Sequence, residues 1–137
     1  MKVLRKLAIL FAGAVFLAAC ANLDTVTNAP KQAGISKTFS EDYELVKAAV
    51  LGSMQSLNIN IKEPAETPNG YAIAFTKSVS AFSWGEVGRV LVSKNSAGGA
   101  RVFVHSEKRS KYQITGADES DFADQIFAGV DEILSKE

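Results

Sequence analysis

Few residues in this chain have side chains that could do chemistry, and they lie far apart in the sequence. The chain has one cysteine, Cys20, and one histidine, His105. A histidine can serve as the general base for a serine nucleophile, but the sequence has no Gly-x-Ser-x-Gly turn to present such a serine. His105 also alternates with Arg101 and Glu107 on one side of a predicted strand. We therefore expect a surface or rim histidine, and no enzyme activity.

Metal and phosphate sites are not expected either. One histidine and one cysteine cannot build the common zinc sites. Four carboxylates cluster near the C-terminus but lack the Asp-x-Asp-x-Asp-Gly spacing of a calcium loop. They stand at the start of a predicted helix, where the helix dipole favours negative charge. The glycine-rich residues 95–99 precede a predicted strand and no Gly-Lys-Ser/Thr follows them, so they indicate a turn. We expect no cofactor and no metal, including at the carboxylates Asp118, Glu119, Asp121 and Asp124.

The N-terminal residues have the pattern of an export signal. The basic residues Lys2, Arg5 and Lys6 precede fifteen residues without charge, from Leu7 to Ala21. A membrane-spanning helix needs about 20 apolar residues, whereas the apolar segment of a secretory signal has roughly 7–15 behind a basic start. We therefore expect a signal peptide, and place it at residues 1–19.

The end of the apolar run, Leu17-Ala18-Ala19-Cys20, resembles the lipobox of bacterial lipoproteins. In that family the peptide is cut just before the cysteine, here between Ala19 and Cys20. The cysteine carries a diacylglycerol thioether, and the new amino terminus usually gains a third acyl chain such as palmitate. Two or three chains bind a membrane firmly, because each buried methylene contributes about 0.8 kcal/mol. The alternatives are an ordinary secretory signal with a chance cysteine, or an uncleaved anchor.

The resemblance also implies a location in the cell envelope. In lipoprotein sorting, an aspartate after the cysteine retains the protein at the inner membrane, and this chain has Ala21 there. In a Gram-negative cell, the implied location is the inner leaflet of the outer membrane, facing the periplasm.

Removing the signal changes the charge of the chain. The full sequence has 15 basic and 15 acidic residues. Without the three basic residues of the signal, 12 basic residues remain against 15 acidic ones, a net charge of −3. Such a domain lacks the basic footprint of a nucleic-acid-binding protein and the basic cluster that binds anionic lipids. With Cys20 acylated, no disulfide can form, so stability must come from one hydrophobic core.

The rest of the chain predicts a tether followed by one domain. Residues 21–37 show no helical or strand period, and we interpret residues 20–37 as the acylated cysteine and a flexible tether, with a reach of about 20–25 Å. Residues 38–137 predict a single α+β domain: a helix, a four-stranded antiparallel meander and a second helix, with both helices on one face of the sheet.

The apolar spacing gives the expected elements. The first helix should be capped by Ser40 and end near Asn58, and its apolar stripe recurs every three or four residues. Strands are expected at 58–62, 71–77, 86–94 and 100–108, and residues 64–70 should form a turn. The last helix follows Asp118. The helix stripes are Tyr43, Val46, Val50, Met54 and Leu57, then Phe122, Ile126, Val130 and Ile133.

Alternation along the strands separates two faces of the sheet. One face is apolar and should meet the helices, through Ile73, Phe75, Val90, Val92, Val102 and Val104. The other face mixes Leu91 and Phe103 with Arg89, Arg101 and His105, so we expect a protein partner or a second copy to bind there. Phe82 and Trp84 stand in a predicted loop, where they either plug the end of the core or anchor an interface.

The order of elements is similar to that of helix-grip domains, such as those in a lipoprotein component of the outer-membrane barrel-assembly machinery. The run Phe82-Ser83-Trp84-Gly85-Glu86, then a hairpin, Ser106-Glu107-Lys108, Gln113 and a last helix, resembles a widespread bacterial domain without assigned activity. The resemblance spans roughly residues 38–135. It favours a non-catalytic interaction or scaffolding module. The alternative is a binder of a small ligand or amphiphile in a cavity between helix and sheet.

Overall fold

The computed structural model describes residues 22–62, 64–78, 85–108 and 118–137. The expected signal peptide with Ala19 and Cys20, and the aromatic residues Phe82 and Trp84, lie outside the described residues. The expectations about them therefore stay predictions. Among the described residues, no helix is long and apolar enough to span a membrane.

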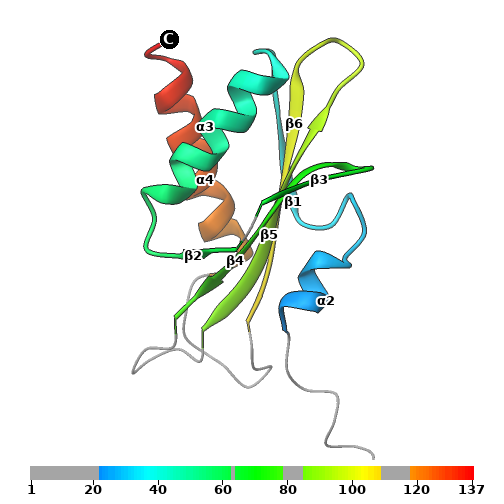
Figure 1. The fold of residues 1–137 in the computed structure, drawn as a ribbon. Helices are drawn as coiled ribbons and strands as arrows, with labels where there is room; N and C mark the ends of the chain where they lie inside the picture. Colours follow the sequence, from blue (N-terminus) through cyan, green and yellow to red (C-terminus); the bar gives the residue numbers. More distant parts are fainter. Residues whose placement is uncertain (1–21, 63, 79–84, 109–117) are drawn as a thin grey trace, which may run out of the picture.

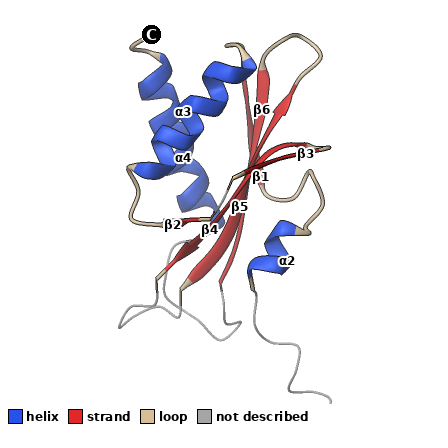
Figure 2. Cartoon of the chain, in the orientation of Figure 1, coloured by secondary structure: helices blue, strands red, loops and turns tan. Residues whose placement is uncertain are grey.

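The chain folds around one antiparallel sheet of six strands (Figure 1). The strand order is β1-β6-β5-β4-β2, and β3 pairs with β4 beside β2. Two helices, α3 and α4, cover one face, and the short helix α2 lies on the other (Figure 2). The elements are α2 (Leu23–Thr27), β1 (Ile35–Phe39), α3 (Tyr43–Gln55), β2 (Asn60–Ile61), β3 (Ala65–Thr67), β4 (Gly70–Lys77), β5 (Glu86–Lys94), β6 (Ala100–Lys108) and α4 (Glu119–Leu134).

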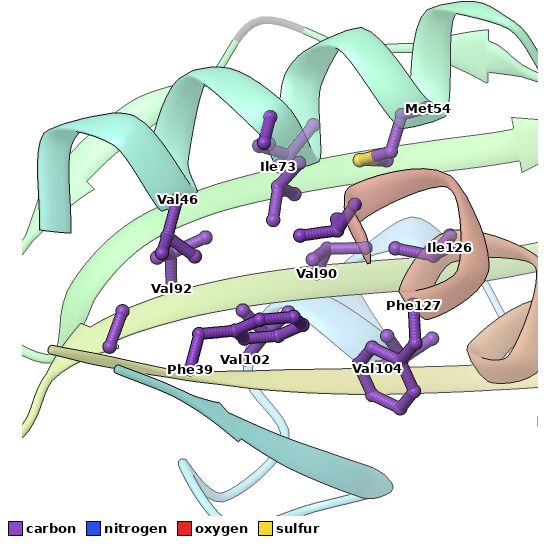
Figure 3. Packing of buried hydrophobic residues seen from close by; sticks show 14 of the residues in the cluster. Phe39, Val46, Met54, Ile73, Val90, Val92, Val102, Val104, Ile126 and Phe127 are labelled. Carbon is purple, nitrogen blue, oxygen red and sulfur yellow. The ribbon is translucent and has the colours of Figure 1, made fainter. Parts of the chain in front are cut away.

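The α+β class and the central meander are confirmed. β4, β5 and β6 pair in chain order, and Val90 of β5 lies in register with Ile73 on one side and Val104 on the other. These apolar side chains alternate toward α3 and α4, as the period of two predicts. Figure 3 shows them packed against residues from both helices, among them Val46 and Ile126.

Both large helices begin close to their predicted positions. The cap of α3 is Asp42 rather than Ser40, because the Asp42 carboxylate accepts a hydrogen bond from the Glu44 N–H at 2.9 Å. α4 starts after Asp118, whose N–H donates to the carboxylate of Asp121 at 2.8 Å. Asp118 and Asp121 at this helix start therefore have the capping role that the sequence predicted.

The prediction of a four-stranded sheet is wrong about the edge strands, because the sheet has six strands. β1 begins in the predicted tether and extends into the predicted domain, and β3 lies in the predicted turn. The strand expected at 58–62 is reduced to two residues. β1 has only one buried apolar residue, Phe39, and owes its conformation to pairing with β6. β3 forms because Pro68 and Asn69 turn the chain onto β4. Such short strands have too few residues to show a period.

α3 and α4 lie in close contact at Gly129. The buried hydroxyl of Ser53 donates to the Ile126 carbonyl at 2.9 Å, which joins the two helices. A Cβ added to Gly129 would lie 2.2 Å from Ser53 Oγ and 2.9 Å from Ser53 Cβ. The glycine is therefore required by the close helix contact.

We predict that Gly129→Ala destabilises the fold although alanine is the better helix former. The methyl group should force the helices apart and cost about 1–3 kcal/mol, which exceeds the gain in helix propensity of about 1 kcal/mol. The free energy of unfolding can be measured by urea titration of the full-length protein in a neutral detergent.

The matched control is Gly52→Ala in α3. Its added Cβ would meet only the end of the Ile133 side chain, at 3.2 Å, and this side chain can move. We expect Gly52→Ala to stay within about 1 kcal/mol of the parent protein. A Gly129→Ala variant as stable as the parent would contradict the close-contact argument.

Candidate functional site

The sheet face that was expected to bind a partner is mostly covered by the chain itself. Leu91 and Phe103 are only 2% and 6% exposed. α2 packs on β5, β4 and β6 over this face, and its Val26 is completely buried (Figure 1). The prediction of an open partner surface is therefore wrong for Leu91, Phe103 and the neighbouring Arg89.

Arg89 is the polar contact that holds this cover in place. Its guanidinium is buried, and Nη1 donates to the carbonyls of Ala29 at 2.7 Å and Thr27 at 3.3 Å. Nη2 donates to the Pro30 carbonyl at 2.9 Å. Carbonyls at the end of a helix lack partners within the helix, and the fork of Arg89 can satisfy several of them at once. We call this contact, made by Arg89 with residues 27–30, the Arg89 clamp.

The charge of Arg89 has no carboxylate partner among the described residues, and its Nε atom has no hydrogen-bond partner there. Burial lowers the pKa of Arg89 from its ordinary value, but a guanidinium remains charged in proteins. The carbonyl dipoles of the clamp therefore provide its main stabilisation.

The described part of the expected tether is ordered against the domain. α2 begins directly after its cap Asn22, whose side chain accepts from the Thr25 N–H at 3.0 Å. Residues 35–37 then belong to β1. The tether expectation is therefore wrong for these residues, and Asn22 follows Cys20 by only two positions in the chain.

The two other described residues of the predicted face lie at its edge. Arg101 is exposed, and Nε and Nη2 donate to Ser36 Oγ on β1 at 3.1 and 3.0 Å. His105 lies at the rim, as expected, with Nδ1 2.8 Å from a Glu119 oxygen and Nε2 3.3 Å from a Glu107 oxygen. The same Glu119 oxygen accepts from the Ser106 N–H at 3.0 Å, beyond the end of the β1 pairing. This carboxylate thus ties α4 to β6.

A surface hollow of about 520 Å³ lies where the start of α3, the β3–β4 turn, the end of β5 and the segment after α2 meet. We call it the rim groove. The groove was not predicted from the sequence because its four segments are far apart in the chain, and the Asn69-Gly70 turn was the one local signal. The lining residues are Lys31, Tyr43, Glu44, Glu66, Thr67, Pro68, Asn69, Gly70, Ser93 and Lys94.

The acidic groups of the rim groove are already neutralised. Lys47 Nζ lies 2.8 Å from a Glu44 oxygen and 3.0 Å from a Glu66 oxygen. Hydrogen bonds to Glu44 and then Glu66 raise the pKa of Lys47 above its ordinary value. The Tyr43 hydroxyl donates to Glu66 at 3.4 Å, and burial together with this carboxylate raises the pKa of Tyr43.

The two lysines that line the groove, Lys31 and Lys94, are not neutralised in this way among the described residues. Lys94 Nζ lies 5.0 Å from the centre of the Tyr43 ring, a favourable cation–π geometry. Among the described residues, neither Lys31 nor Lys94 forms an ion pair with a carboxylate. The groove therefore has positive charge available for a ligand.

We predict that Arg89→Met releases α2 from the sheet. Methionine fills much of the space but cannot donate to the three carbonyls, so we expect a loss of about 1.5–3 kcal/mol in unfolding free energy. Hydrogen exchange should become faster at the amide of Asn28, the residue that follows α2 and whose N–H donates to the Asp24 carbonyl. Arg101→Met, an exposed arginine on the same face, should change stability by no more than about 0.5 kcal/mol. Equal effects of the two variants would refute the clamp.

A scan of the chain against protein-family models finds no match, and a search of curated proteins finds none. The lipobox and helix-grip resemblances therefore stay predictions, and the function has to be argued from residues and geometry.

Proposed function

We propose that this chain is a lipid-anchored protein of the cell envelope, attached through Cys20 to the inner leaflet of the outer membrane and facing the periplasm. Its domain is a non-catalytic interaction or scaffolding module. The lipobox pattern at residues 17–20 supports the anchor. The observation that carries the proposal is the packing of α2, which fixes the first described residues after the anchor onto the domain.

This packing has a consequence for the position of the domain. Two residues of extended chain reach at most about 7 Å, so an acylated Cys20 would hold the domain directly at the bilayer surface. Figure 1 shows the start of α2 at the same end of the sheet as the start of β5 and the end of β6. In the proposed state this end of the sheet faces the membrane.

A non-catalytic role is supported by the surroundings of His105. Both ring nitrogens face carboxylates, from Glu119 and Glu107, which leaves neither nitrogen to activate a hydroxyl or thiol. Among the described residues, no group of three histidine, cysteine or acidic side chains is placed to hold a metal ion.

The partner surface of the proposed module must differ from the expected one. Leu91 and Phe103 are occupied by α2. The outer strand β1 forms one edge of the sheet and presents Ile35, which is 37% exposed. A sheet edge can pair with a strand of another protein, so we place the protein contact at this edge of the sheet.

Ligand binding is the second candidate function, but at a different place from the cavity expected between helix and sheet. The side chains between α3, α4 and the sheet are packed together and buried (Figure 3). The rim groove is favoured instead, because it is hollow and has two lysines without carboxylate partners among the described residues.

We predict that mass spectrometry of the protein from native membranes finds a peptide beginning at Cys20 with the added mass of a diacylglyceryl group and one further acyl chain. Cys20→Ala is the control, because it cannot form the thioether and should keep Met1 without added mass. An unacylated Cys20, or an intact Met1 in the parent protein, would overturn the proposed anchor.

A further inference from the structure

We propose that the rim groove binds the anionic group of a small solute, a single carboxylate or phosphate. This inference does not depend on the lipid anchor. The groove volume of about 520 Å³ lies within the usual range of about 300–1,000 Å³ for small-molecule sites.

The charge balance of the groove favours one negative charge. Lys47 neutralises Glu44 and Glu66 through contacts of 2.8 and 3.0 Å. Lys31 and Lys94 line the hollow together with Glu44 and Glu66, and Lys47 lies outside the lining. Because Lys47 pairs with both glutamates, these three lysines and two carboxylates have a net charge of +1. This positive site is local, because the whole chain has a formal charge of zero. Fixed positive charge in a concave site attracts small anions.

Ser93 provides a hydroxyl at the wall of the groove. It lines the groove beside Lys94, the next residue in the chain, and is only 6% exposed. A serine hydroxyl can donate a hydrogen bond to an anionic oxygen. An anion in the groove would accept this hydrogen bond.

The walls of the groove are held in place before a ligand binds. Gly70 has φ of +130°, and a Cβ there would lie 2.2 Å from the Val92 carbonyl oxygen, so the β3–β4 turn rests on the β5 backbone. Lys31 follows Pro30, whose carbonyl is held by Arg89 at 2.9 Å. A preformed site loses less conformational entropy on binding. The groove therefore combines charge, a hydroxyl and a fixed shape.

The test is a titration of the full-length ¹⁵N-labelled protein in a neutral detergent, with inorganic phosphate in one series and acetate in another. Sodium chloride at the same ionic strength is the reference for screening. We expect saturable shifts of the Lys31, Gly70 and Lys94 amides with a dissociation constant of about 1 mM, as for a site with few contacts. Saturation by phosphate alone, by acetate alone or by both supports the site and identifies which anion it prefers.

Lys94→Gln and Ser93→Ala should each weaken binding about tenfold, because each removes one hydrogen bond to a charged group. Lys62→Gln is the matched control: it changes an exposed lysine that does not line the groove and should leave binding unchanged. The urea midpoint of each variant shows whether it is folded. Lys94→Gln and Ser93→Ala test independently whether the anion binds in the groove.

Three results would overturn the proposal. One is the absence of saturable shifts with either anion. Another is shifts of equal size with sodium chloride, which would indicate screening of charge. The third is an equal affinity for the anion in Lys94→Gln, Ser93→Ala and the control Lys62→Gln. The anion would then bind elsewhere.

Discussion

The buried guanidinium of Arg89 joins the sheet to the N-terminal segment that contains α2. A charged group inside a protein is stable only when its hydrogen-bonding atoms find partners. Here the carbonyls of Thr27, Ala29 and Pro30 supply most of them, at 2.7–3.3 Å. The Thr27 carbonyl is available because α2 ends at this residue, and Ala29 and Pro30 lie in the turn that follows the helix. The contact therefore fixes where the N-terminal segment lies, and the groove wall at Lys31 depends on it.

The clamp also changes how the apolar sheet face is used. Leu91 and Phe103 would form an exposed apolar patch without α2, and such patches favour association with other molecules. With Val26 packed over them, the patch becomes a second, smaller core opposite the main one. The surface left for recognition is then polar or lies at the sheet edge. This favours recognition by charge and hydrogen bonds over a broad apolar contact.

The sequence predicted those elements that are long enough to show a period. The bounds of β5 and β6 agree with the expected strands. The expected stripes of α3 and α4 are buried, except that Leu57 and Ile133 are only partly buried. α2, β1 and β3 have five residues or fewer. Such segments are stabilised by the sheet they contact, so their own residues carry little signal. The rim groove was missed for a related reason, since it joins four segments that only the fold brings together.

By itself, the order of residues determined the α+β class, the main core and the presence of an export-type N-terminal pattern, because each depends on local spacing and composition. The tertiary structure decided which face of the sheet is free, where residues 22–37 lie and which charges remain unpaired. Those properties depend on contacts between distant residues: Arg89 with residues 27–30, and Lys47 with Glu66. The strength of such contacts depends on burial and distance, which the sequence does not contain.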